Sequence, residues 1–224
     1  MKTINAKGKM KNAKWKILTS AICILPFAFL LLSGCAAFQV GGEIQPGRKA
    51  LMYGDPKVAV AHFQRAAELD PNYLYFSVLP QGVWTYVGRA DYAIGRIPEA
   101  VKALERARTR SSQDEMAKLY LGLALARDGN RERGLKELQG GMRGLHDWLE
   151  QITYNTEYGQ YWDPNREIRS EIQRNLAVAT GREPDLKSLI ANAEWLGKRM
   201  EDEIDLARRN EVMERMRPGD STEP

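Results

Sequence analysis

The chain has 224 residues, with 33 basic and 29 acidic side chains and two cysteines, Cys23 and Cys35. Two cysteines are too few for a framework of several disulfides. Six of the lysines lie in the first 16 residues, so the rest of the chain is close to neutral and lacks the basic field that would attract nucleic acid.

The N-terminal segment has the layout of a secretory signal. Its lysine-rich start is followed by sixteen uncharged residues, and Pro26 interrupts a run already short for a permanent membrane span. Leu32-Ser33-Gly34-Cys35 resembles a bacterial lipobox, which implies a signal peptide over 1–34 and a lipid on Cys35. The same resemblance implies anchoring in the cell envelope, at the outer membrane if the cell has two membranes. A soluble secreted protein and an uncleaved anchor are the alternatives.

Three segments of the following region repeat one pattern. Each starts with a glycine, and then has a small residue five positions later, a large apolar residue four further on and a small residue three after that. A second glycine precedes each segment by seven positions. The pattern predicts paired helices, because small residues let helices approach closely and glycine suits a left-handed helix end. The residues are Gly47, Gly54, Ala59, Phe63 and Ala66; Gly88, Gly95, Ala100, Leu104 and Ala107; and Gly122, Gly129, Gly134, Leu138 and Gly141.

The second and third segments are 34 residues apart. With this period, the pattern of glycine, small and large apolar residues resembles the tetratricopeptide repeat over residues 40–142. Trp84-x-x-Val87-Gly88 matches the first helix of that family, and Ala59-x-x-x-Phe63 matches the second. The resemblance implies an all-α solenoid of about three helical hairpins within a repeat domain over 35–142. Three departures stand out: Pro46, which predicts a late start of the first helix; seven extra residues around 74–80; and glycine instead of alanine in the third unit, which we expect to weaken its second helix.

The sequence pattern of residues 143–217 predicts a helical extension. Apolar residues continue at helical spacing to Ile152, an aromatic stretch follows, and Asp163-Pro164 indicates a new helix that ends near Gly181 as a degenerate fourth hairpin. A long charged helix is predicted from Pro184 to Arg217, and we interpret it as the polar cap that closes a solenoid. A coiled-coil arm is the alternative. Residues 218–224 are predicted to be a flexible tail.

Catalytic patterns are missing from the sequence. His62 and His146 stand in no motif with a nucleophile or ligand, and His62 is expected on an outer, solvated face. The sequence therefore predicts neither an enzyme nor a cofactor or metal site.

The family resemblance also implies a concave groove lined by the first helix of each hairpin. Its arginines and apolar positions would suit an acidic, partly apolar segment of a partner protein. Alternatively, the arginines are solvated or paired with acids of the second helices. The groove positions are Arg48, Leu51 and Met52; Thr85, Arg89, Tyr92 and Ala93; and Leu119, Leu123, Ala126 and Arg127.

Together these features predict a lipid-anchored interaction scaffold of the bacterial cell envelope that binds protein partners and no nucleic acid. One alternative is a peptidoglycan-binding or hydrolytic protein that uses the aromatic cluster Tyr154, Tyr158, Tyr161 and Trp162. Another is a secretion or pilus component that self-associates through the 74–80 insert or the long helix. The second aromatic group, Tyr73, Tyr75, Phe76 and Trp84, is expected to pack locally under the insert.

Overall fold

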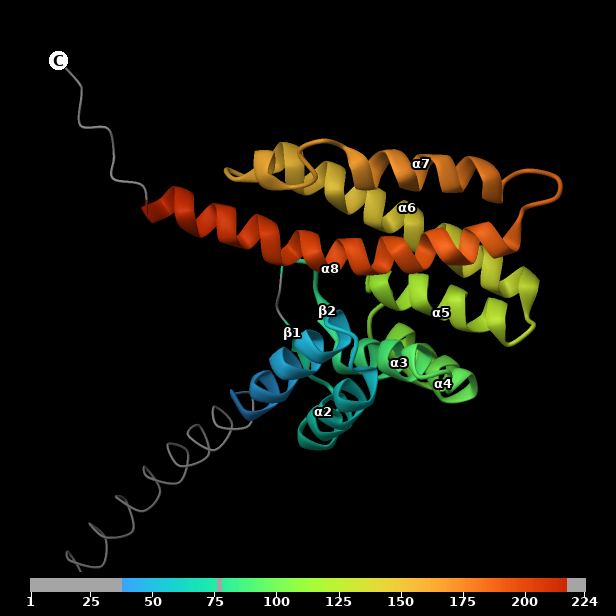
Figure 1. Cartoon of the computed structure of the whole chain (residues 1–224), viewed down its shortest axis with the longest axis horizontal. Coiled ribbons are helices and arrows are strands. Elements are labelled where there is room, and N and C mark those ends of the chain that lie inside the picture. The colour runs from blue at the N-terminus through green and yellow to red at the C-terminus, as the bar shows by residue number, and fades with distance from the viewer. Residues whose placement is uncertain (1–37, 76–77, 217–224) are drawn as a thin grey trace, which may run out of the picture.

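The computed structural model describes residues 38–75 and 78–216 (Figure 1). The predicted signal peptide, Cys35, Phe76 and the C-terminal tail lie outside these residues. The described chain is almost entirely helical, which confirms the all-α class. A helix over 38–52 is followed by α2 (Pro56–Leu69), β1 (Leu74–Tyr75), β2 (Gln81–Gly82), α3 (Val83–Ala93), α4 (Ile97–Arg110), α5 (Glu115–Arg127), α6 (Arg131–Asn155), the short 3₁₀ turn η1 (Gly159–Tyr161), α7 (Glu167–Ala179) and α8 (Leu186–Met216).

The repeated glycines end the first helix of each predicted hairpin. Gly54, Gly95 and Gly129 adopt φ angles of +90°, +80° and +89°, a region that other residues rarely enter. Each is followed within two residues by the next helix, so helix 38–52 pairs with α2, α3 with α4, and α5 with α6. The predicted glycine turns are confirmed.

The second set of glycines marks where the two helices of a hairpin approach most closely. A Cβ on Gly47 would overlap the ring of Phe63, one on Gly88 would overlap Leu104, and one on Gly122 would overlap Leu138. All three large residues are completely buried. One glycine-to-apolar contact therefore recurs in all three hairpins, at the positions that the repeat pattern aligned.

In the third hairpin, the glycines that we expected to weaken α6 have a packing role. A Cβ on Gly134 would lie 2.7 Å from the backbone nitrogen of Ala126, and one on Gly141 would lie 2.6 Å from that of Leu119. Because α5 and α6 touch backbone to backbone here, alanine would push them apart. Glycine at these two positions lowers the helix propensity of α6, but only glycine is small enough for this contact.

Two predicted boundaries differ from the structure. The first helix is already formed at residue 38 and continues through Pro46, so the expected late start is wrong. In addition, α6 runs unbroken past residue 142, where we placed the end of the repeat domain. Its second half packs against α7, as expected for a fourth hairpin, but the two predicted domains share one helix.

At the insert, the short strands β1 and β2 pair antiparallel, with Leu74 opposite Gly82 and Tyr75 opposite Gln81. Tyr73, Tyr75 and Trp84 are partly buried against the apolar core of the first two hairpins, so the expected local packing is confirmed for these three. Asp114 holds the insert to α5, because it accepts hydrogen bonds from the Gly82 and Ala117 backbone nitrogens.

The last helix, α8, does not close the end of the stack. It lies across the middle of the molecule, with α6 and α7 along one side and α3 and α5 along the other (Figure 1). Its predicted apolar stripe is buried in this position: Leu189, Ala193, Leu196, Met200 and Ala207. The cap interpretation is therefore wrong, and the buried part of the stripe is not free for a coiled coil. Within the described ranges, every helix is too short or too polar to cross a bilayer.

Candidate binding groove beneath the C-terminal helix

The three predicted groove arginines all reach α8. Arg48 lies on helix 38–52, Arg89 on α3 and Arg127 on α5, the first helix of each successive hairpin. Arg48 donates from Nε and Nη2 to Oε2 of Glu201, at 2.9 and 2.7 Å, and Arg89 donates to the other oxygen of the same carboxylate. One glutamate of α8 therefore joins the first two hairpins.

Gln81 completes this arrangement. Its side-chain nitrogen donates to Glu201 Oε1 at 2.8 Å, and its oxygen accepts a hydrogen bond from Arg89 Nη1 at 2.7 Å. We call Arg48, Gln81, Arg89 and Glu201 the groove cluster. Each of these side chains is at most 5% exposed, so the cluster is shielded from water. Gln81 could not be found from the repeat pattern, because it directly follows the insert at 74–80 and has no counterpart among the aligned positions.

Two arginines facing one carboxylate set the protonation states of the groove cluster. Burial by itself raises the pKa of Glu201, but the charges of Arg89 and Arg48 and the bond from Gln81 outweigh it and hold the pKa at about 2. Burial likewise acts to lower the pKa of both arginines, and the charge of Glu201 raises it overall. The cluster is therefore fully ionised at neutral pH, and removing either partner would leave a buried charge uncompensated.

A second acid of α8 binds the third hairpin. Glu194 accepts a hydrogen bond from the Tyr92 hydroxyl and pairs with Arg127, whose guanidinium lies 4.5 Å from the centre of the Tyr92 ring. Burial and the hydrogen bond to Glu194 together raise the pKa of Tyr92. Farther along α8, Asp205 pairs with Arg48 at 3.1 Å. All three predicted groove arginines therefore bind acids of α8, whereas we had considered solvent, a partner or the second helices.

A cavity of about 410 Å³ remains between α8 and the inner helices. Its wall combines the apolar side chains of Leu51 and Met52 with Tyr92, Tyr120 and the partly exposed Arg127. A second hollow, of about 390 Å³, lies beside it between helix 38–52 and Asp205 of α8, and Met52 borders both. The open space in the groove is thus concentrated along helix 38–52.

Other predicted groove positions lie elsewhere. Leu119 and Leu123 are completely buried in the main apolar core, and Ala126 faces Gly134 of α6. The hydroxyl of Thr85 donates to Asp114 at 2.6 Å. The three α5 residues do not face the groove because α5 is covered on several sides, and Thr85 of α3 is turned towards Asp114. Of the apolar groove positions, Leu51, Met52 and Ala93 border the cavity.

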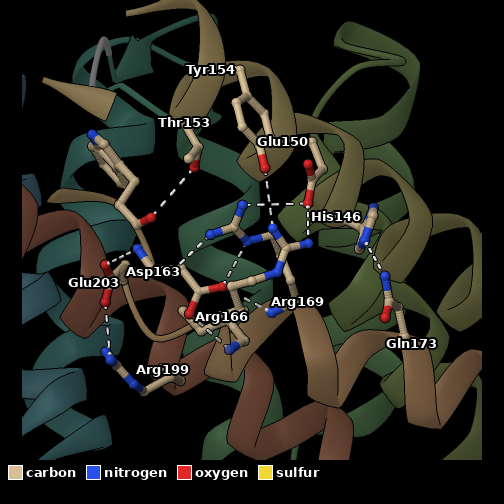
Figure 2. A network of polar contacts seen from close by, with 12 residues as sticks. His146, Glu150, Thr153, Tyr154, Asp163, Arg166, Arg169, Gln173, Arg199 and Glu203 are labelled. Atoms are coloured by element: carbon tan, nitrogen blue, oxygen red, sulfur yellow. Dashed lines mark hydrogen bonds and ion pairs between the residues drawn. The ribbon is translucent and has the colours of Figure 1, made fainter. Parts of the chain in front are cut away.

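A second buried charge cluster fixes the other side of α8 (Figure 2). The Asp163 carboxylate pairs with Arg169 at 3.0 Å and accepts hydrogen bonds from the Ile168 and Arg169 backbone nitrogens in the first turn of α7. The helix itself starts at Glu167 with Arg166 as its N-cap residue, so the start predicted at Asp163-Pro164 is too early. The backbone nitrogen of Asp163 in turn donates to Glu203 of α8 at 2.6 Å, and Arg199 pairs with Glu203. Glu201 and Glu203 thus fasten neighbouring positions of α8 to different parts of the molecule.

The aromatic stretch divides into core and surface. Trp162 is completely buried and packs edge-to-face on Trp148, so it offers no stacking surface for a sugar. Tyr154 is exposed, and Tyr158 stacks on Tyr161 beneath the guanidinium of Arg215. Trp162 therefore cannot belong to the predicted glycan surface, whereas Tyr154, Tyr158 and Tyr161 are at least partly exposed.

The two histidines lie apart. His62 is not the solvated residue that we expected, because its Nδ1 lies 2.7 Å from Glu43 and its side chain is about one-third exposed. His146 lies 3.0 Å from the side-chain nitrogen of Gln173 (Figure 2). In the part of the chain that the structure describes, there is no cluster of three or more metal-binding side chains.

Comparison with family models, with curated proteins and with solved structures finds no match for this chain. The function is therefore inferred from the residues and geometry of the groove.

Proposed function

We propose that the protein is a lipid-anchored scaffold of the bacterial cell envelope, of the tetratricopeptide-repeat type, whose inner face binds a segment of a partner protein. The observation that carries the proposal is the row of arginines. One arginine from each of three successive hairpins faces the same surface, and all three hold carboxylates of an amphipathic helix. Such a surface provides charge for specificity and apolar area for affinity.

The described residues support binding better than chemistry. The buried arginines of the groove are matched by carboxylates of α8, and the cavity beside them combines apolar walls with charged edges of both signs. Pockets of this composition suit a protein segment that contributes both apolar and charged side chains. We therefore propose no catalytic role.

The envelope location depends on Cys35 and the lysine-rich segment before it. Acyl chains on Cys35 would hold the protein at a membrane, because each buried methylene contributes roughly 0.8 kcal/mol and two or more chains make the attachment stable. Mass spectrometry of the mature N-terminus tests this part. A Cys35→Ser variant should lose the acyl mass and leave the membrane fraction, and a wild-type chain without acyl mass would contradict the proposal.

Photo-crosslinking in living cells tests the scaffold role. A photoreactive residue at Met52 or Ala93, both bordering the cavity, should trap discrete partner proteins. The matched control is Val178, an exposed apolar residue on α7, away from the groove. Identical products from all three positions, or none from the groove positions, would contradict the proposal.

A further inference from the structure

The acids that α8 presents to the groove form one regular row. Glu194 contacts the third hairpin through Arg127, Glu201 contacts the second through Arg89, and Asp205 contacts the first through Arg48. Glu201 follows Glu194 by seven residues and Asp205 follows Glu201 by four, and such positions lie on one face of a helix. The groove thus contacts α8 in the way that we propose for a partner segment.

A glycine in α8 adds a requirement for shape. A Cβ at Gly197 would lie 2.5 Å from the Tyr120 hydroxyl and 2.8 Å from its ring, so a larger residue cannot lie at this point of the groove. Glycine inside a helix costs about 1 kcal/mol relative to alanine, and here it permits the close contact. The groove therefore accepts the pattern Glu-x-x-Gly-x-x-x-Glu-x-x-x-Asp, read from residue 194 to 205.

We propose that α8 is an internal competitor for the groove, and that the partner segment is an acidic amphipathic helix with this pattern. This inference rests on the scaffold function proposed above. Arg48 and Arg89 lose their carboxylate partner when α8 leaves, so an incoming segment that buries them again must supply carboxylates at matching positions. An apolar or basic segment does not meet this requirement.

The connection between α7 and α8 keeps the closed state dominant. Residues 180–185 form the short link, and a segment tethered over such a distance acts at an effective concentration on the order of millimolar. Glu203, bonded to the Asp163 backbone, holds the opposite side of α8 in addition. The resting protein is therefore closed, and a free helix binds it weakly until α8 is loosened.

Two variants loosen α8 by different means and leave the groove residues of the hairpins unchanged. Glu201→Gln removes the central carboxylate, and Gly197→Leu creates a clash with Tyr120. The probe is a fluorescent peptide of residues 190–209, titrated into the full mature protein in detergent and followed by anisotropy. Both variants should bind it at least about tenfold more tightly than the wild type, because the tethered competitor is weakened. Glu68→Gln, the same chemical change at an exposed position of α2, should bind like the wild type.

Charge dependence provides the second arm. Adding Arg48→Gln and Arg89→Gln to the Gly197→Leu protein should abolish the gained affinity, and a peptide with glutamine or asparagine at positions 194, 201 and 205 should not bind. If the variants and the wild type bind the peptide equally, or if the arginines have no effect, the competitor proposal is wrong. Circular dichroism checks that each variant retains its helix content.

Hydrogen exchange on the unmodified protein decides the matter if the variants do not fold. An excess of peptide should lower protection of the amides of residues 190–209 in the protein and leave α5 protected; unchanged protection in α8 would overturn the proposal.

The crosslinking experiment distinguishes failure of the competitor proposal from failure of the scaffold proposal. When the Gly197→Leu protein is expressed in cells, the yield of partner crosslinks from a photoreactive residue at position 52 should rise. An unchanged yield overturns competition and leaves the scaffold standing, whereas no crosslink in either background contradicts the scaffold function itself.

Discussion

The hairpins and α8 are held in place by different physical means. Within each hairpin, a glycine lies against a large buried apolar side chain, such as Gly88 against Leu104, and no charge is involved. At the inner face, α8 is held by the buried carboxylate of Glu201 between Arg48 and Arg89. Close apolar packing depends on shape and is insensitive to pH, whereas a buried ion cluster depends on charge and can be satisfied by another carboxylate of the same placement. The contacts within the hairpins thus depend on shape alone, whereas the attachment of α8 depends in part on charge.

The largest effect is expected from breaking the groove cluster. Glu201→Gln should lower the free energy of unfolding by about 3–5 kcal/mol, because two buried guanidinium groups lose their counter-charge. Urea denaturation followed by circular dichroism measures the change. Glu68→Gln should stay within about 0.5 kcal/mol of the wild type. A loss below about 1 kcal/mol for Glu201→Gln would mean that the cluster does not hold α8.

The pH dependence of that loss sharpens the comparison. The pKa of Glu201 is lowered from 4.5 to about 2, so its contribution is complete above pH 4.5 and disappears as the pH falls towards 2. The stability difference between the wild type and Glu201→Gln should shrink by ~3 kcal/mol over this range. Denaturation curves at several pH values test this, and a difference that stays constant would contradict the assigned ion cluster.

A change inside a hairpin should behave differently. Gly141→Ala would place a methyl group 2.6 Å from the Leu119 backbone nitrogen, and overpacking of this kind costs about 1–3 kcal/mol. Because no ionisable group takes part, the same loss should be measured at pH 7 and pH 3. A loss that varies with pH would show that hairpin packing and the groove cluster are coupled.

The smallest effect is expected one residue earlier. A Cβ on Gly140 would meet nothing within 4 Å, so Gly140→Ala should raise the free energy of unfolding by about 0.5–1 kcal/mol through helix propensity alone. Thermal denaturation of the two neighbouring variants gives the sign directly. Destabilisation by Gly140→Ala would show that α6 has a second close contact on its other side.

The hairpins could be predicted because their determinants are local. The turn at Gly95 and the contact between Gly88 and Leu104 involve residues close together in the sequence. Because the same spacing occurs three times, these positions can be recognised in the sequence. The partner of Arg89 could not be predicted in this way, since Glu201 lies 112 residues farther along the chain. One signal was nevertheless available: Arg48 and Arg89 directly follow equivalent glycines, Arg127 lies one helical turn after the corresponding Leu123, and one later helix carries three acids at helical spacing. Matching these two sets of charges would have placed α8 on the inner face.

The errors in the groove have one physical origin. A solenoid helix taken from a family pattern is assumed to leave one face open, whereas α5 packs against α3, α4, α6 and α8. Leu123 therefore belongs to the core. Arg127 borders the cavity because it lies in the last turn of α5, where a long side chain can extend past the packed region to reach Glu194.

The continuous helix α6 has a consequence for how the molecule can be divided. Its 25 residues correspond to a rod of roughly 37 Å that begins beside α5 and ends beside α7. A chain cut after residue 142 would sever this rod in mid-helix and remove Leu145, Leu149 and Ile152 from the core. The repeat region is therefore not a separable module, and genetic dissection of the protein will be informative through point changes in α8 but not through removal of its C-terminal third.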